Sequence, residues 1–395
     1  MLLVGFQDFV QARFQLQRPD NVKDWTGSWS NASAAARHPY LQSQVLKGHA
    51  AWDSEFYISI ALHGYEDPAM RAASPSSTPD AEVAGPKKGH ANWVSLNHAF
   101  FPGYPFAMGL MARPLAALGF EQVGAATLAG VAVSLVSALF AMFAMADLAL
   151  SDREAEAGDG VRAAFYLAVW PAAMFMAQVY SEALFLALSF GALAMMKRDR
   201  WGWAAALAVA AVFTRATGVL LVIPFGLTWL GLGDRRSIGR AIFAASPVIA
   251  YAGWRLLFGR DFDFVETRYF GRWPFAIGPS IDAWTDFAET LLGGDPQARA
   301  YDLTELFGIV AALVTSVLLW RRDKALTLYG LATFAVVATS GAALGMHRYA
   351  LAMPALFLAP AQLGRGPVFD RVWTLVCCLG LGVLTLLFSF GFWAG

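Results

Sequence analysis

The sequence predicts an all-α, polytopic membrane protein. Of its 395 residues, 57% are hydrophobic and only 15% are charged, whereas soluble domains carry about 25% charged residues. Long apolar runs recur from about residue 120 onwards. The formal net charge is +0, so no basic surface favours a nucleic-acid partner. The only cysteines, Cys377 and Cys378, are neighbours in an apolar run, which provides neither a disulfide framework nor a metal cluster.

About ten transmembrane helices are expected from the apolar runs. A helix needs roughly 17 to 25 apolar residues to cross a bilayer, and several of the runs are short of that length. The predicted spans are Val123–Ala146, Ala163–Tyr180, Ser181–Met196, Trp201–Phe213, Ala216–Leu232, Ala241–Leu257, Leu303–Trp320, Ala325–Gly345, Tyr349–Leu363 and Val372–Trp393.

The basic residues between these runs predict the orientation of the chain. Cytoplasmic loops are enriched in Lys and Arg, and four connections carry such clusters: 197–200, 235–240, 321–324 and 365–371. Two predicted spans separate each cluster from the next, so all four can lie inside. The same count places outside the residues 1–120, 178–182, 214–218, 258–302 and 345–349.

Residues 1–120 are therefore predicted to form an extracytoplasmic segment that precedes a transmembrane domain of residues 121–395. Trp52, Phe56 and Ile60 recur every four residues, which predicts an interfacial helix over 52–65 with an apolar stripe. Asp53, Tyr57 and His63 fall outside that stripe.

Residues 105–119 are apolar but contain Arg113 and Pro114. A crossing there would place the 52–65 stretch inside, so we predict a second interfacial or re-entrant helix. The 258–302 loop is long and carries Trp273 and Trp284, so a further interfacial helix is expected in it.

Asp53 and Glu55 are the first candidates for chemistry. A carboxylate at the membrane face can act as the general base on an acceptor hydroxyl, or it could hold a divalent ion. The competing interpretation is that Asp53 caps the helix, with Glu55 as an acid in its first turn. Capping and catalysis do not exclude each other. His98 and His347 with Asp53 could make a metal site, but their spacing resembles no metal-ligand motif.

Several other predicted outer residues are candidates for substrate contacts. Arginine at membrane depth is costly and usually has a partner, and a guanidinium matches phosphate geometry. Arg215 and Arg348 therefore could bind a lipid phosphate or, alternatively, extend towards the headgroups. The position of Glu182 favours a role at the start of a helix that Ser181 caps over a role in substrate binding. The remaining candidate contacts are His98, Tyr104, Arg268, His347 and Tyr349.

Five short motifs together resemble the PIG-V family, the GPI mannosyltransferase 2 enzymes and their bacterial relatives. They are Trp52-Asp53-Ser54-Glu55-Phe56, His63-Gly64-Tyr65, the run from Asn97 to Pro105, Tyr180-Ser181-Glu182-Ala183-Leu184-Phe185 and Thr214-Arg215-Ala216-Thr217-Gly218. Arg348-Tyr349 is a looser match. The resemblance implies a helical glycosyltransferase of the GT-C class, with a polyprenyl-phosphate sugar donor and a catalytic acid in the first outer loop. That role falls to Asp53, and Glu55 matches the family's second acid.

The expected function is thus inverting transfer of a hexose, mannose by resemblance, to a lipid, glycan or protein acceptor, with Arg215 and Arg348 on the donor phosphate. No cofactor is obligatory, although a divalent cation is compatible with the site, and membrane lipids surround the chain. A bacterial inner membrane with an extracytoplasmic site is the expected location. The family has a span before its first outer loop, and the sequence predicts none here. The alternatives are a lipid-linked sugar flippase or transporter, and a binding subunit without turnover.

Overall fold

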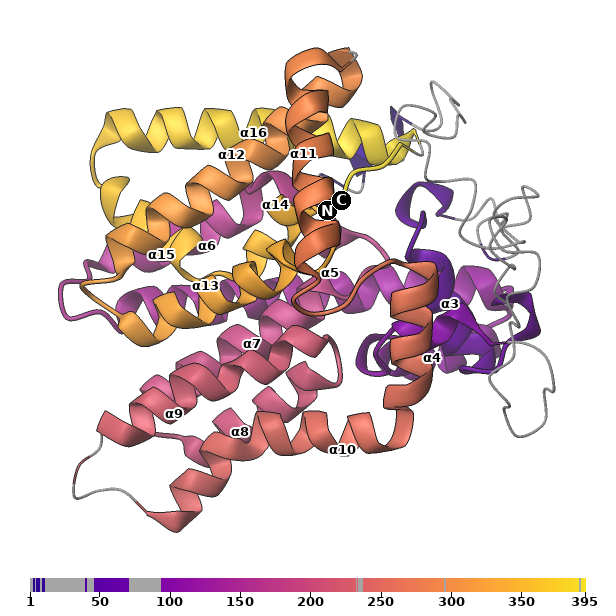
Figure 1. Cartoon of the computed structure of the whole chain (residues 1–395), viewed down its shortest axis with the longest axis horizontal. Coiled ribbons are helices and arrows are strands. Elements are labelled where there is room, and N and C mark those ends of the chain that lie inside the picture. Colours follow the sequence, from indigo (N-terminus) through magenta and orange to yellow (C-terminus); the bar gives the residue numbers. More distant parts are fainter. Residues whose placement is uncertain are drawn as a thin grey trace.

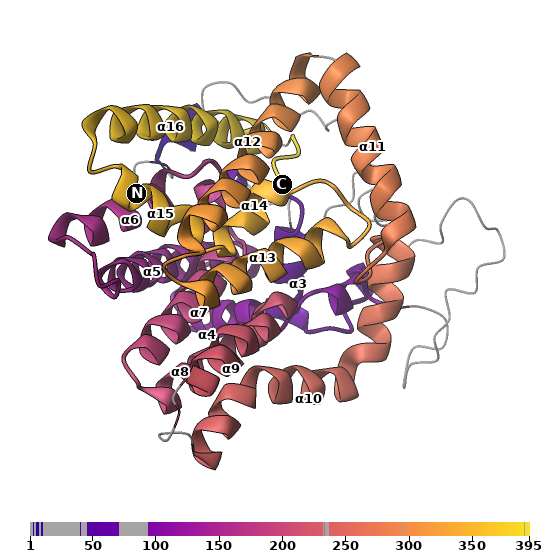
Figure 2. The same ribbon diagram turned by 60° about the vertical axis from the view of Figure 1, so that its left-hand side comes forward.

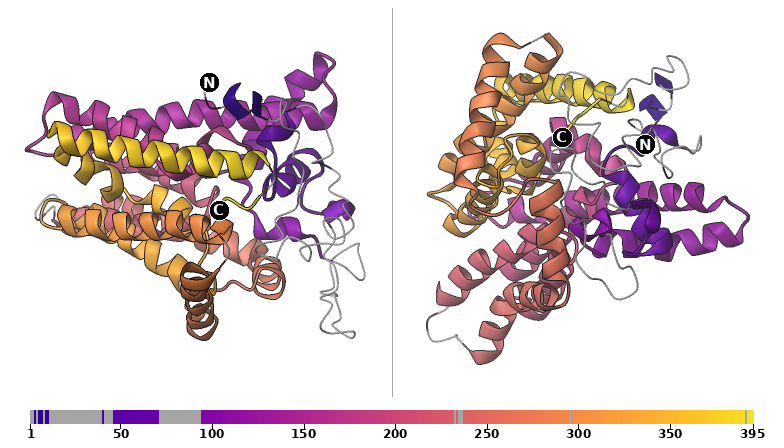
Figure 3. Two further views of the ribbon diagram at one scale, coloured as in Figure 1. Left: turned by 90° about the horizontal axis from the view of Figure 1, so that it is seen from above. Right: turned by 45° about the vertical axis from the view of Figure 1, so that its right-hand side comes forward.

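The computed structural model describes residues 3, 5–7, 9–10, 40, 46–70, 94–231, 233, 237–294, 296–390 and 392–395. This part of the chain is helical and contains no strand, which confirms the predicted fold class. Long helices lie side by side in a bundle, and α3 (Ser54–His63) and α4 (Gly103–Ala117) gather at one end of it (Figures 1 and 3). Most residues before position 46, where the family has a further span, lie outside the described ones.

Four helices are long and apolar enough to cross a membrane: α5 (Gln122–Leu150), α10 (Ile238–Tyr269), α12 (Pro296–Leu319) and α16 (Pro367–Ser389). A fifth candidate is the pair α6 (Ala157–Val169) and η4 (Pro171–Ala177), which is bent by 82°. The predicted count of ten crossings is therefore not confirmed, although helices occur in all ten predicted segments. The shorter helices are α7 (Glu182–Lys197), α8 (Trp201–Val212), η5 (Ala216–Leu221), α9 (Val222–Gly231), α13 (Lys324–Ala338), α14 (Met346–Tyr349) and α15 (Ala355–Leu363).

Prolines account for two of the interruptions in the predicted spans. A proline disfavours the helical conformation at the residue before it. Trp170, before Pro171, is extended at φ −55° and ψ 142°, and Met353, before Pro354, has ψ 105°. The predicted spans 163–180 and 349–363 are therefore broken helices, and their breaks lie beside the site described below.

The connection predicted over 258–302 contains a further helix, as expected, but the preceding helix extends further into it than its apolar run predicted. Helix α10 continues to Tyr269, α11 (Ile277–Gly293) follows, and α12 begins at Pro296. Charged residues in 258–269 end the apolar run without ending the helix, because polar side chains such as Arg and Glu are good helix formers. With α11, the end of α10 forms an outer wall along one edge of the bundle (Figure 2).

The stripe predicted for 52–65 is also wrong. Trp52 precedes α3, and every residue from Ser54 to Ser59 is buried. The helix packs against both α4 and α5, so more than one of its faces is covered. Helix α4 has 15 residues, a length of about 22 Å, which is less than the hydrocarbon thickness of a bilayer.

All four predicted inner loops are joined at one end of the bundle by ion pairs. Lys197 pairs with Asp323, and Arg240 pairs with Asp199 at 2.8 Å. Arg365 reaches Asp159 of α6. Because Lys197 and Glu182 occupy opposite ends of the 16-residue helix α7, this network lies about 22 Å along the helix from Glu182.

Candidate active site

A cavity of about 240 Å³ opens at the end of the bundle that carries α3. Its walls come from segments far apart in the sequence: α3, the turns after α8 and α10, α13 and the residues around α14. Charged and aromatic side chains line it together, including Asp53, Tyr57, Phe100, Arg215, Glu266, Arg272, Trp273, Arg348 and Tyr349.

Asp53 lies at the rim of this cavity, directly before α3. It occupies the N-cap position, but its side chain makes no capping hydrogen bond. Instead, Arg348 Nη2 donates to Asp53 Oδ2 over 3.1 Å. The capping interpretation therefore does not describe the side chain, whose carboxylate faces the cavity and an arginine.

The backbone before Asp53 is held in an unusual conformation. Trp52 has a φ of +56°, which is a rare conformation for a bulky residue and costs on the order of 1–3 kcal/mol. The surrounding contacts hold it there: His49 O accepts from Val179 N at 3.1 Å, and Ala51 O accepts from Tyr180 OH at 3.0 Å. The segment before α3 is thus attached to the chain that leads into α7, and this attachment sets the position of Asp53.

Glu182, the first residue of α7, joins the two predicted phosphate-binding arginines. Its Oε1 accepts from Arg215 Nη1 and from Arg348 Nε. The exposed side-chain fractions are 4% for Glu182, 6% for Arg348 and 16% for Arg215. A buried charge needs a partner, so the three residues act as one unit, and Glu182 does more than start a helix.

Ser181, the predicted cap of α7, makes no capping bond. Its Oγ lies 2.9 Å from Tyr57 OH and accepts from Arg215 Nη1 at 3.4 Å. Burial, followed by the nearby Glu182 and Asp53, raises the pKa of Tyr57 above its ordinary value. Tyr57 therefore stays a neutral hydroxyl in the cavity wall at physiological pH.

Aromatic rings surround both arginines. The Arg348 guanidinium carbon lies 4.8 Å from the ring centre of Phe175 and 4.7 Å from that of Tyr180. Arg215 lies 5.1 Å from the ring centre of Tyr349. Cation–π contacts of this kind strengthen when they are desolvated, so the rings stabilise arginines that would otherwise be costly to bury.

Behind Arg348, Glu305 of α12 anchors the turn that carries it. Glu305 accepts from Gly345 N, from His347 N at 2.9 Å and from Tyr301 OH, and His347 Nδ1 lies 2.8 Å from Oε2 with both side chains fully buried. A Cβ at Gly308 would come within 2.7 Å of His347, so a glycine is needed for α12 to approach this turn. His347, predicted to contact substrate, instead packs beneath the site.

Besides Glu182 and His347, four other predicted site residues do not line the cavity. Glu55, in the first turn of α3, is buried, with 3% of its surface exposed. His98 Nε2 lies 3.3 Å from Glu66, and Tyr104 OH donates to Gly130 O, which attaches α4 to α5. Arg268 is exposed near the end of α10. A residue that is close in sequence to Asp53, or to a cluster of aromatic residues, therefore does not necessarily lie at the site.

Gly103 positions Arg215 through the backbone. Its N–H donates to Phe213 O over 2.7 Å, and a Cβ there would meet Phe213 O and Thr214 Oγ1, each at 2.8 Å. The start of α4 therefore contacts the turn before Arg215 so closely that only glycine fits. This contact explains why the Pro102-Gly103-Tyr104 segment sits beside the arginine.

Three charged residues that line the cavity, Asp263, Glu266 and Arg272, were not predicted as site residues. All three lie in the predicted 258–302 connection; Asp263 and Glu266 belong to the last turns of α10, and Arg272 to the turn that follows. The one available signal was the succession Arg272-Trp273-Pro274, which places a cation next to an aromatic ring in an outer connection.

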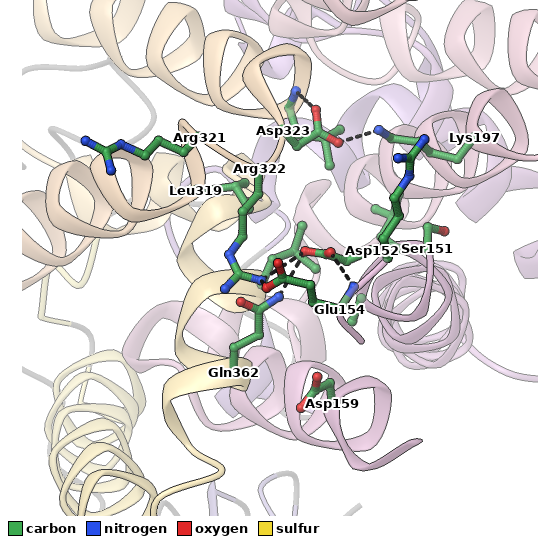
Figure 4. A pocket seen from close by; sticks show the side chains of 15 residues that line it. Ser151, Asp152, Glu154, Asp159, Lys197, Leu319, Arg321, Arg322, Asp323 and Gln362 are labelled. Carbon is green, nitrogen blue, oxygen red and sulfur yellow. Dashed lines mark hydrogen bonds and ion pairs between the residues drawn. The ribbon is translucent and has the colours of Figure 1, made fainter. Parts of the chain in front are cut away.

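A larger cavity of about 350 Å³ lies at the opposite end of α7, among the basic loops (Figure 4). Its charges are mostly paired with one another: Arg322 with Glu154 at 2.8 Å, and Lys197 with Asp323. Partial burial opposes ionisation of Asp152, but the backbone of Glu154, with Gln362 and Arg322, lowers its pKa below the ordinary value. These pairs join the inner loops to one another, and we assign them a structural role.

Lys197→Ala is therefore expected to leave unchanged the sugar transfer that the motif resemblance predicts. Near-surface ion pairs contribute about 0–1 kcal/mol, and this one lies at the far end of α7 from Glu182. Thermal unfolding of the purified protein should show a small shift at most. A loss of transfer at normal stability would instead assign this cavity a part in the function.

Among the described residues, no group of three or more His, Cys, Asp or Glu side chains could hold a metal ion. Three carboxylate side chains line the cavity: Asp53, Asp263 and Glu266.

The comparisons with known proteins agree with the motif resemblance. Residues 87–228 match the family model of mannosyltransferase (PIG-V), which includes Glu182 and Arg215 but neither Asp53 nor Arg348. The GPI alpha-1,6-mannosyltransferase 2 of Rattus norvegicus is 31% identical over 217 residues, which are 53% of this chain and 36% of that protein. The human protein of the same name is 31% identical over 186 residues, 45% of this chain and 30% of that protein.

The solved structures that resemble the chain are more distant. An oligosaccharyltransferase of Archaeoglobus fulgidus aligns with all of this chain and 55% of its own, at 12% identity and a TM-score of 0.44. A second structure of an oligosaccharyltransferase from that organism, in complex with an inhibitory peptide and a dolichol-phosphate, gives a TM-score of 0.45. A likeness this weak carries no argument about the site.

The chain spans about a third of the length of the curated relatives that it matches. Within that extent, the matched region contains the turn before η5, which supplies Arg215 to the cavity, and the start of α7, which supplies its ion-pair partner Glu182. Residues 87–228 of the chain are therefore similar to the mannosyltransferase (PIG-V) family.

Proposed function

We propose that this protein is an inverting membrane glycosyltransferase of GT-C type. It moves a hexose, mannose by family, from a polyprenyl-phosphate donor to a lipid, glycan or protein acceptor. The observation that carries the proposal is the position of Asp53, whose carboxylate lies at the rim of a cavity lined by arginines and aromatic side chains. The family match supports the sugar and the reaction class.

The reaction is a single displacement. Asp53 takes the proton of the acceptor hydroxyl as that oxygen attacks the anomeric carbon. The bond from the anomeric carbon to the phosphate oxygen breaks, and the electron pair leaves with the polyprenyl phosphate. Arg215 and Arg348 face the developing negative charge and stabilise it. Attack opposite to the leaving group inverts the anomeric configuration.

The location follows from the arrangement of charges. The four basic loops lie together at one end of the bundle, whereas Asp53 lies near the other. Positive residues favour the cytoplasmic side, so we place the cavity at the extracytoplasmic face of a bacterial inner membrane. Lipid surrounds the apolar exposed faces of α10, α12 and α16, and the donor's chain lies among them.

The direct test is a transfer assay in membranes with radiolabelled polyprenyl-phosphate mannose and a lipid extract as acceptor. We expect label to enter a new product. Absence of transfer from any polyprenyl-phosphate sugar, with retained binding of the lipid, would contradict the enzyme and favour a flippase or a binding subunit.

Arg215→Ala is expected to lower the transfer rate by about 10²–10³-fold, the usual effect of removing one group that stabilises transition-state charge. Glu182 keeps Arg348 as a partner in this variant, so folding should survive. Arg268→Ala is the matched control, because Arg268 is exposed and does not line the cavity. Equal rates for the two variants would remove Arg215 from the mechanism.

A further inference from the structure

The last turns of α10 and the turn that follows present two opposite charges to the cavity, Glu266 and Arg272. In the described part of the chain, neither side chain makes a hydrogen bond or an ion pair. This distinguishes them from the arginines on the facing wall. Arg348 donates to Glu182, Asp53 and Gly395 O, so each of its nitrogens already has an acceptor.

The charges on the cavity wall therefore fall into two groups. Arg215 and Arg348 offset Glu182 and Asp53, and they form a cluster without net charge. Asp263, which also lines the cavity, is held by both terminal nitrogens of Arg255. Glu266 and Arg272 are the two charges left with free bonding capacity. A half-buried cationic group in that condition favours an anionic ligand.

The turn is fixed rather than loose. Arg272 N donates to Glu266 O at 3.0 Å, and Trp273 N donates to Ser340 O, beyond the end of α13, at 3.1 Å. Gly271 has a φ of +63°, a conformation that glycine adopts without strain. The wall that α10 and α11 form along the edge of the bundle (Figure 2) thus carries these two side chains at a defined position.

The electrostatic surroundings keep Arg272 cationic. Burial opposes its charge, but the nearby Tyr349, Glu266 and Asp53 raise its pKa above the ordinary value. A guanidinium offers paired donors that match two phosphate oxygens, whereas a carboxylate accepts hydrogen bonds from hydroxyls. A ligand that satisfies both carries a phosphate next to a hydroxylated ring.

We propose that Arg272 and Glu266 form the headgroup subsite for the donor. Arg272 binds the phosphate, and Glu266 accepts hydrogen bonds from the sugar hydroxyls and contributes to the choice of sugar. Arg215 and Arg348 then act mainly on Asp53 and on the charge that develops during the reaction. This inference rests on the proposed function for the identity of the sugar, but the phosphate assignment can be tested without turnover.

The first experiment measures binding of sugar-free polyprenyl phosphate to the detergent-purified full chain. Arg272→Gln should weaken binding by about 10- to 100-fold, the effect of losing charge-assisted hydrogen bonds. Arg268→Gln, four positions earlier and outside the cavity, should bind as the wild type does. Equal binding by the two variants, at equal melting temperatures, would overturn the phosphate role. So would a wild type that binds no polyprenyl phosphate.

The second experiment separates Glu266 from Arg272. Glu266→Gln should bind sugar-free polyprenyl phosphate as the wild type does, yet bind polyprenyl-phosphate mannose about tenfold more weakly. Asp263→Asn is its control on the same helix, because that carboxylate already has Arg255. A loss of binding to both ligands would overturn the hydroxyl role. If the wild type binds polyprenyl phosphate, Arg272→Gln weakens this binding and no transfer is detected, the phosphate assignment stands and the proposed enzyme is rejected.

Discussion

Asp53→Asn is expected to abolish measurable sugar transfer, a loss of about 10²–10⁴-fold, in a protein that folds as the wild type does. The amide has nearly the shape of the carboxylate and can still accept from Arg348 Nη2, which now donates over 3.1 Å. It cannot take a proton from the acceptor hydroxyl. Initial transfer rates in membranes with equal amounts of each variant give the comparison, and melting temperatures in detergent verify the fold.

Glu55→Gln is the informative companion to this variant. Glu55 matches the family's second acid, but it is buried and does not line the cavity. If Asp53 alone is the base, Glu55→Gln should transfer sugar at a rate near that of the wild type wherever its melting temperature is preserved. Retained turnover in Asp53→Asn would contradict the base role of Asp53. Equal losses of transfer in the two variants would indicate that Asp53 and Glu55 share that role.

Glu182→Gln is expected to reduce both stability and transfer. It leaves Arg215 and Arg348 buried without the carboxylate that they share, and breaking a buried ion pair costs about 3–5 kcal/mol. The melting temperature should fall by several degrees or more. Transfer should fall as well, because Arg348, which contacts Asp53, loses its second anchor.

A double variant separates the two effects of this change. Glu182→Gln combined with Arg215→Gln removes one carboxylate and one guanidinium, so fewer unpaired charges remain buried. Its melting temperature should exceed that of Glu182→Gln, and its transfer should remain low. If Glu182→Gln melted and transferred as the wild type does, the cluster would have neither a structural nor a functional role.

Much of the helical architecture could be predicted because it depends on local sequence. Composition alone predicted the all-α class, and the run from Val123 to Ala146 became α5 almost at its predicted limits. Crossings were harder to count. Prolines at 171 and 354 divided two runs, and 258–269 stayed helical although it is polar, because hydropathy reports burial in lipid and not the backbone conformation.

The candidate site was predicted in part. Asp53, Arg215 and Arg348 line one cavity, as does Tyr349. His98, Tyr104, Arg268 and His347 were chosen for their chemical type and predicted side, and they lie outside it. Chemical type cannot distinguish a residue that faces a cavity from one that packs behind it, as His347 does against Glu305.

The sequence by itself determined the membrane class, the grouping of basic loops at one end and the motifs around Asp53, because each depends on residues close together in the chain. Only the tertiary structure decided that Asp53 and Glu182 share one arginine, Arg348, which lies 295 residues after Asp53. It also decided that Arg272 reaches the same cavity. The physical reason is that a buried charge must find its partner in space, and the helix packing that brings the partner near leaves no pattern in sequence spacing.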